Sequence, residues 1–229
     1  MSDKLDNESK VLSRRIVVTA DGSTSIEIPE MDEMYHSKKG AIQESQFVYV
    51  DHGLALLTKP NVDVLEIGMG TGLNLLLFHL YAEKNVLTIH YCTLEPYPLT
   101  ENEWQHLNYE ALLDVREGMV KRIHSAEPNV NFQVSDFVNA EVHHSKLEDW
   151  TVNGAFDLVL FDAFAPNKQS NPWVLSNIKK LYDLLRPGGI LTTYCAQGQF
   201  KRNLQSVGFE VTNPKGPMGK REITVAIKN

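Results

Sequence analysis

The chain has little cysteine and no long hydrophobic run, and each absence excludes a class of protein. Its two cysteines, Cys92 and Cys195, are too few for a disulfide framework or for a zinc site built from cysteines. Both lie in apolar, strand-like runs, so we expect buried reduced thiols. The most apolar stretch, Leu73 to Ala82, is too short to span a bilayer, and the polar start MSDKLDNESK lacks the apolar core of a signal peptide. We therefore expect a cytoplasmic protein with no membrane contact.

Acidic residues outnumber basic ones, but the basic residues gather near the end of the chain. The formal net charge is −7. Residues 163–229 hold ten Lys/Arg and three Asp/Glu, a net charge of +7, so residues 1–162 carry −14. The overall balance argues against a general nucleic-acid coat, whereas a basic C-terminal third suits a polyanionic partner.

Strand-like and helix-like segments alternate from residue 62 onward. Short apolar runs predict five strands at residues 62–67, 88–95, 129–136, 155–162 and 189–196. Alternation with helices is typical of an α/β fold with a parallel sheet covered on both faces. Two last runs, 209–213 and 221–227, follow each other through a hairpin-like loop, so the final strand should insert antiparallel. That ending is typical of a class I methyltransferase-type, Rossmann-like sheet rather than an ordinary dinucleotide-binding one.

The segment before this sheet has a different pattern. RRIVVTADGSTSIEI places Asp21-Gly22 between two β-rich runs, which predicts a β-hairpin. Glu30 to Leu57 reads as irregular. We therefore predict an N-terminal tail, β-hairpin and substrate-side extension over residues 1–58, followed by the Rossmann-like domain over residues 59–229.

The strongest local signal is the glycine-rich segment Glu66-Ile67-Gly68-Met69-Gly70-Thr71-Gly72, where a predicted strand runs into a helix. Open α/β sheets bind ligands at such a place, and glycines let a ligand approach the backbone closely. The nicotinamide fingerprint fails because Leu73 replaces its third glycine, and no Gly-Lys-Ser/Thr follows. The segment resembles motif I of S-adenosylmethionine-dependent methyltransferases. The resulting candidate cofactor-binding residues are Glu66, Gly68, Gly70, Thr71, Gly72 and Asn74.

Carboxylates end the next three predicted strands. Glu95, followed by Pro96, ends the second strand, where a carboxylate can accept both ribose hydroxyl protons. Asp136 ends the predicted third strand and is placed to accept the adenine amino group, as in similar enzymes; the alternative is a helix N-cap. Asp162 ends the fourth strand, facing the methyl donor in this fold. It is the candidate catalytic residue, able to orient an amine and accept its proton, and with Glu95, Pro96 and Asp136 it completes the candidate cofactor-binding residues.

The loop after Asp162 carries a close family resemblance. D-A-F-A-P-x-K, from Asp162 to Lys168, and the Pro172-Trp173 step resemble the methyltransferase domain of the bacterial bifunctional tRNA-modifying protein MnmC and its stand-alone form MnmD. Gly68 to Asn74 matches the family's G-x-G-T-G-L-N, and Glu95 to Thr100 its E-x-x-P-L-T. Further likenesses are the segment Lys215 to Glu222 and, upstream, Tyr35, Ser37, Gly40 and Glu44.

The resemblance implies a reaction and its participants. Members of this family use S-adenosylmethionine to methylate the 5-aminomethyl group of uridine, often 2-thiolated, at the wobble position of tRNA. The expected partners are therefore the tRNA anticodon loop and the enzymes that make the aminomethyl precursor. Wobble bases can be splayed onto aromatic side chains, for which Phe164, Tyr97 and Trp173 are candidates, each with core packing as the alternative.

The candidate substrate-binding residues are Tyr35, Phe164, Pro166, Lys168, Trp173, Lys220 and Arg221. Phosphate contacts are expected from basic residues of the C-terminal third, although each one taken singly can also be an ordinary solvated side chain. They are Lys179, Lys180, Lys201, Arg202, Lys215, Lys220 and Arg221.

The sequence disfavours two other functions and a metal site. A small-molecule amine methyl- or aminopropyltransferase similar to spermidine synthase shares the hairpin, the approach segment and Asp162, but it has no use for a C-terminal third with a net charge of +7. A protein that only binds a partner is disfavoured because Glu95, Asp136 and Asp162 are all present. No metal site is expected, because the eight histidines show no ligand spacing.

Overall fold

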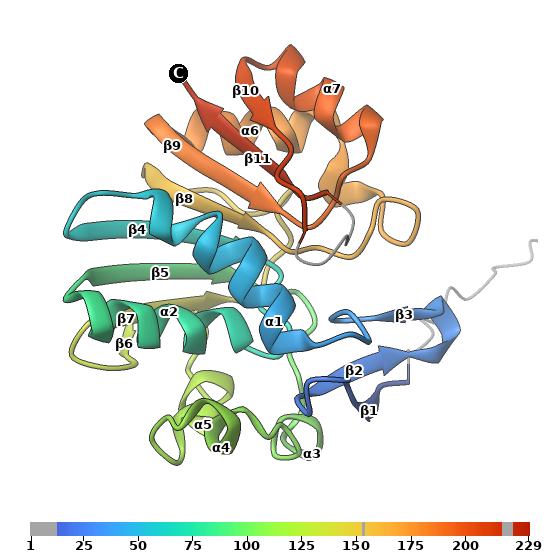
Figure 1. Ribbon diagram of the computed structural model, residues 1–229, viewed down its shortest axis with the longest axis vertical. Helices are drawn as coiled ribbons and strands as arrows, with labels where there is room; N and C mark the ends of the chain where they lie inside the picture. The colour runs from blue at the N-terminus through green and yellow to red at the C-terminus, as the bar shows by residue number, and fades with distance from the viewer. Residues whose placement is uncertain (1–12, 153, 217–221) are drawn as a thin grey trace, which may run out of the picture.

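A computed structural model describes residues 13–152, 154–216 and 222–229, and within them a mixed eight-stranded sheet runs in the order β10-β11-β9-β8-β4-β5-β7-β6 (Figure 1). The strands are β4 (Asn61–Ile67), β5 (Thr88–Leu94), β6 (Phe132–Gln133), β7 (Val138–His143), β8 (Phe156–Phe161), β9 (Leu185–Thr193), β10 (Phe209–Thr212) and β11 (Thr224–Lys228). β4, β5, β7, β8 and β9 run parallel. β11 is antiparallel to both β9 and β10, which confirms the predicted fold class and its antiparallel ending.

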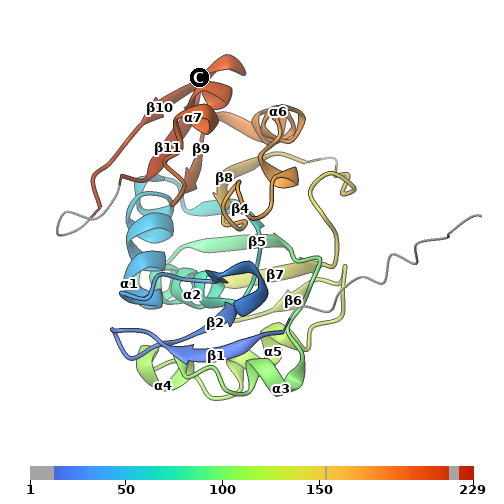
Figure 2. The ribbon, with the colours of Figure 1, turned by 90° about the vertical axis from the view of Figure 1, so that its right-hand side faces the viewer.

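Helices cover both faces of this sheet, as Figure 2 shows for α1 and α2 on one side and α6 on the other. The α-helices are α1 (Ala41–Ser45), α2 (Leu73–Asn85), α3 (Glu101–Trp104), α4 (Tyr109–Leu113), α5 (Met119–His124), α6 (Leu175–Leu184) and α7 (Gly198–Ser206). Shorter turns are the 3-10 helices η1 (Pro29–Met31), η3 (Leu54–Leu56) and η4 (Asn171–Trp173) and the π-helix η2 (Gln46–Asp51).

The two faces hold separate cores because side chains alternate along each strand. Val62 and Val64 of β4 pack with α2, whereas Leu65 and Ile67 pack with α6 and α7 on the opposite face. β4 thus supplies buried apolar side chains to both faces, as expected of a parallel strand that is covered by helices on both sides.

The N-terminal extension forms its own antiparallel sheet of β1 (Arg15–Val18), β2 (Thr24–Ile28) and β3 (Glu33–Met34). The predicted hairpin at Asp21-Gly22 is confirmed. In Figure 1 this small sheet lies beyond the arrowheads of β5, β7 and β9, at the carboxyl ends of the parallel strands. It therefore stands over the edge at which open α/β sheets bind ligands.

The expectation of irregular structure from Glu30 to Leu57 is wrong for its second half. Residues 41–56 form α1, η2 and η3. Ala41, Val48, Val50 and Leu54 are buried in the core shared with α2, and this packing stabilises helical turns that the mixed sequence does not announce.

The predicted third strand at residues 129–136 is also wrong. The strand beside β5 is β7, which buries Val138, Ala140 and Val142 on one face. The earlier run forms the short antiparallel edge strand β6, and then a turn in which the Ser135 N–H donates to the Val138 carbonyl (3.1 Å). Asp136 thus precedes a parallel strand instead of ending one.

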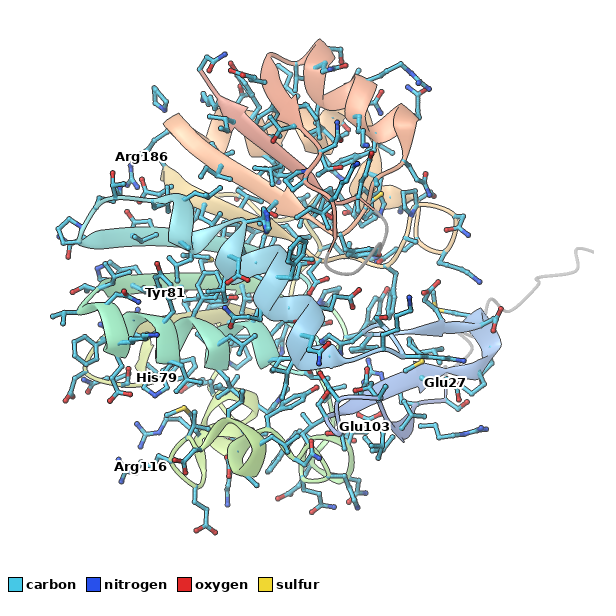
Figure 3. All side chains as sticks on the ribbon, in the orientation of Figure 1. Glu27, His79, Tyr81, Glu103, Arg116 and Arg186 are labelled. Carbon is cyan, nitrogen blue, oxygen red and sulfur yellow. The ribbon has the colours of Figure 1, made fainter. Side chains whose placement is uncertain are left out.

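Ion pairs tie the amino ends of the parallel strands together. Arg186 of β9 pairs with Asp63 of β4 and Asp157 of β8, both at 2.8 Å, and Lys59 also pairs with Asp157. Figure 3 labels Arg186 at the end of the sheet opposite Glu27 and Glu103 of the extension side. Among the described residues, no helix has the length and apolar character needed to cross a membrane.

Candidate active site

A cleft of about 1210 Å³ lies between the carboxyl ends of the parallel strands and the N-terminal extension. It exceeds the roughly 300–1,000 Å³ of a typical small-ligand pocket, so it has room for a cofactor and part of an acceptor. Of the residues predicted from the sequence, the cleft brings together Tyr35, Gly68, Gly70, Thr71, Asn74, Glu95, Pro96, Asp162, Phe164 and Lys168. Others in the described ranges do not line it: Glu66, Gly72, Asp136, Pro166 and Trp173. Lys220 and Arg221 lie outside the described residues.

The glycine turn between β4 and α2 requires glycine for two physical reasons. Gly68, Gly70 and Gly72 have φ of 92°, 52° and 73°, the left-handed region that strains other residues. A Cβ on Gly68 would lie 2.7 Å from the Asp162 carbonyl oxygen, and one on Gly70 would lie 3.0 Å from Tyr35 Cδ2. The turn therefore holds β4 close to the end of β8 and leaves its backbone open to the cleft.

Glu95 is fixed at the end of β5 by the glycine turn itself. Its Oε2 accepts the Gly70 N–H at 2.8 Å and its Oε1 accepts the Tyr97 N–H at 2.9 Å. The side chain is 7% exposed, on the cleft wall. The carboxylate thus braces the turn and keeps further lone pairs for a ligand hydroxyl.

Asp162 is held from two directions at the end of β8. Tyr49 Oη of η2 donates to Oδ1 at 2.6 Å, and Asn74 Nδ2 of α2 donates to Oδ2 at 2.9 Å. Burial raises the pKa of Asp162 to about 7, the two donors oppose that rise, and the nearby Glu44 carboxylate adds to it. An aspartate near this value can exchange a proton at neutral pH.

Glu66 lies behind the cleft wall, not on it. Its carboxylate is fully buried and accepts hydrogen bonds from Asn74 Nδ2 (2.8 Å) and Thr93 Oγ1 (2.9 Å). Burial raises the pKa of Glu66 to about 8. Since Asn74 Nδ2 also reaches Asp162, Glu66 orients the amide that holds Asp162, and its predicted direct contact with the cofactor is not supported.

Asp136 and Trp173 have positions other than those predicted. Asp136 sits at the amino end of β7, at the sheet edge away from the cleft, because the third strand begins after it. Residues 145–147, just after β7, line the cleft in its place. Trp173 is 5% exposed, packs between Phe161 and Phe200, and donates its indole N–H to the Phe164 carbonyl at 2.8 Å. For Trp173 the core-packing alternative holds.

The loop after β8 is anchored over the cleft. Lys168 Nζ donates to the Met31 carbonyl at 2.6 Å and the Asp32 carbonyl at 3.3 Å, which ties this loop to the extension. The Phe164 ring stands edge-on to Tyr35, with centroids 5.2 Å apart. These contacts give the cleft an aromatic wall beside this loop. Pro166 belongs to the same loop but does not line the cleft.

Several cations of the C-terminal third already have partners within the fold. Lys179 pairs with Asp183 at 2.8 Å and Lys201 with Glu222 at 3.2 Å, while Lys180 donates to backbone carbonyls. The net charge of +7 counted from the sequence therefore overstates the positive charge that these three side chains have available to bind a phosphate. Lys38 and Lys146, both exposed, line the cleft.

The cleft is also lined by three residues that the sequence did not predict, Tyr49, Ser45 and Tyr194. Tyr49 and Ser45 lie in the segment expected to be irregular, where no periodicity pointed to them. Tyr194 follows β9 and donates to the Ala163 carbonyl at 2.8 Å. Tyr194 could have been predicted, because it stands at the carboxyl end of β9, and open α/β sheets bind ligands at the carboxyl ends of their parallel strands.

These features fit S-adenosylmethionine. The open glycine turn admits a ligand against the backbone, and Glu95 offers acceptors for ribose hydroxyls beside it. Asn74 Oδ1, buried on the cleft wall, has no hydrogen-bond partner among the described residues, so it can accept from a donor such as the cofactor's ammonium group.

Fold and cleft together define a class I S-adenosylmethionine-dependent methyltransferase. The chain belongs to the family described as S-adenosyl-L-methionine-dependent methyltransferase, whose sequence profile matches residues 100–229. This confirms the predicted enzyme class and S-adenosylmethionine as the cofactor.

The chain is also similar in sequence to bifunctional tRNA-modifying proteins. The chain is 30% identical over 219 residues to the tRNA 5-methylaminomethyl-2-thiouridine biosynthesis bifunctional protein MnmC of Pseudoalteromonas atlantica, covering 86% of this chain and 31% of that protein. It is 26% identical over 222 residues to the MnmC of a Marinomonas species, covering 87% and 32%. The chain thus spans about a third of the length of these curated relatives. The resemblance inferred from the motifs is confirmed.

Solved structures agree on the fold. MNMC2 from Aquifex aeolicus has a TM-score of 0.75 at 24% identity, covering 96% of this chain and 72% of that one. Spermidine synthase from Thermotoga maritima has a TM-score of 0.59 at 14% identity, covering 96% and 71%.

Proposed function

We propose that this chain methylates the nitrogen of the 5-aminomethyl group of a uridine, with or without a 2-thio group, at the wobble position of tRNA. The observation that carries the proposal is the placement of Asp162, a carboxylate on the cleft wall that Tyr49 and Asn74 hold in place at the end of β8. The similarity to MnmC proteins supplies the acceptor class.

The chain's own residues supply alignment and proton removal. When bound, S-adenosylmethionine supplies an activated methyl group. An alkylammonium has no lone pair, so Asp162 accepts one of its N–H protons and releases it to water after the transfer. Glu95, Pro96 and the glycine turn hold the cofactor in this proposal, and Asn74 positions Asp162 toward the amine.

The aromatic residues of the cleft suit a splayed base. Tyr35 and Phe164 pack edge-on against each other and line the cleft, and single-stranded loop bases stack on aromatic rings. Exposed Lys38 and Lys146 at the cleft, with Lys220 and Arg221, are the proposed phosphate contacts. Residues 1–58 act in this proposal as the acceptor-side extension of the domain formed by residues 59–229.

The test is a methylation assay on tRNA from cells that lack this gene. Labelled S-adenosylmethionine is supplied, and the nucleosides are separated and weighed by mass spectrometry. We expect label in 5-methylaminomethyl-uridine or its 2-thio form. Label transferred to a free polyamine or nucleoside as efficiently as to tRNA would refute the proposal and favour the small-molecule amine transferase.

A further inference from the structure

An unpartnered hydroxyl faces the cleft next to the helix that holds Tyr49. Ser45 is 1% exposed, its Oγ has no hydrogen-bond partner among the described residues, and it lines the cleft. Tyr49 stands four residues later, one turn on, and donates to Asp162. Buried hydroxyls are normally paired, so this oxygen has hydrogen-bonding capacity left for a ligand in the cleft.

A second carboxylate on the same wall is held in place by the extension. Glu44 Oε2 accepts the Ser37 N–H at 2.7 Å, and Glu44 lines the cleft. Its charge raises the pKa of Asp162, Tyr49 and Tyr194, which places it within electrostatic reach of all three. A carboxylate has about four lone-pair positions, so it can accept hydrogen bonds from several donors at once.

We infer that Glu44, Ser45 and Asp162 form a subsite for a primary alkylammonium group, one acceptor for each of its three N–H donors. The inference rests on the proposed function and names the chemistry by which the acceptor is chosen. An ammonium that leaves water needs each N–H paired, and this wall offers three acceptors and negative charge.

The same three residues also determine which amines bind weakly. A methyl-accepting group whose amine carries a carboxylate brings a second negative charge close to Glu44 and Asp162 and is repelled. A monomethylated ammonium group has only two N–H bonds, so one hydrogen-bond acceptor of the subsite loses its partner and the product binds more weakly than the substrate. The subsite thus favours a single methylation of a primary amine.

The test measures binding of anticodon stem–loop RNAs that differ only at the wobble base. They carry 5-aminomethyl-uridine, the uncharged 5-methyl-uridine, or 5-carboxymethylaminomethyl-uridine. We expect the wild-type protein to prefer the aminomethyl RNA over the methyl RNA by about 10–100-fold, the worth of hydrogen bonds to a charged group. Glu44→Gln should reduce this preference about tenfold, and Ser45→Ala about threefold.

The controls separate this subsite from the fold and from the proposed function. Glu148→Gln, a change at an exposed carboxylate on the cleft rim, should keep the wild-type preference. Cofactor affinity should stay unchanged in Glu44→Gln and Ser45→Ala, and the melting temperature of Ser45→Ala should not fall, because no described partner is lost.

The outcomes are decisive in both directions. Full preference for the aminomethyl RNA in both variants, or no preference in the wild-type protein, would overturn the subsite even if methyl transfer to tRNA is observed. A preference that depends on Glu44, without methyl transfer, would uphold the subsite and refute the proposed function.

Discussion

Replacing Tyr49 with phenylalanine should move the pH dependence of methyl transfer without affecting cofactor binding. Tyr49 Oη donates to Asp162 Oδ1 at 2.6 Å and thereby stabilises the charged carboxylate. A hydrogen bond to a charged group is worth about 1.5–3 kcal/mol, and one pKa unit corresponds to about 1.36 kcal/mol. Losing the donor should therefore raise the pKa of Asp162 by about one to two units.

The sign of the effect follows from the role of Asp162 as proton acceptor. Burial raises the pKa of Asp162 to about 7, so about half of the wild-type carboxyls are ionised at pH 7, and the rate should rise with pH through that value. In Tyr49→Phe only about 1–10% would be ionised at pH 7. We expect a rate about 5–50-fold lower at pH 7 and recovery near pH 9.

The assay is single-turnover methylation of tRNA between pH 5.5 and 9.5 at saturating cofactor. Tyr194→Phe is the matched control, because its hydroxyl donates to the Ala163 carbonyl and not to Asp162; its profile should keep the wild-type midpoint. An unchanged midpoint in Tyr49→Phe, or an equal shift of the midpoint in both variants, would refute this role of the Tyr49 hydroxyl.

Three further predictions concern the acids of the site. Asp162→Asn should lower turnover by ~10²–10⁴-fold and leave cofactor affinity nearly unchanged, with partial rescue at high pH; loss of cofactor binding in calorimetry would contradict this. Glu95→Ala should weaken S-adenosylmethionine binding by about 1–3 kcal/mol, and unchanged calorimetric affinity would remove Glu95 from the cofactor site. Burial raises the pKa of Glu66 to about 8, so the folded state binds more protons than the unfolded chain between about pH 4.5 and pH 8. Stability should fall as the pH rises through that window, and Glu66→Gln should flatten the fall in urea unfolding at pH 5 and pH 8; an equally steep fall in the variant would refute it.

The sequence by itself determined the parts of the site that consist of residues close together in the chain. Apolar runs that end in Gly68, Glu95 and Asp162 predict strands, and parallel strands bring their carboxyl ends to one edge. The hairpin-like final pair likewise required an antiparallel last strand. These features depend on local chemistry and on the short-range rules of α/β folds, so they could be read without coordinates.

Tertiary structure alone decided which distant side chains meet. Tyr49 and Asp162 are 113 residues apart in the chain, and Tyr49 lies in a segment whose helical turns are stabilised by burial against α2 rather than by its own pattern. Asp136 was misplaced because strand β7 starts where a face of alternating apolar residues can pair with β5. Trp173 belongs to the core because Phe161 and Phe200 pack around it. In each case the deciding energy is burial between segments remote in sequence, which no local pattern records.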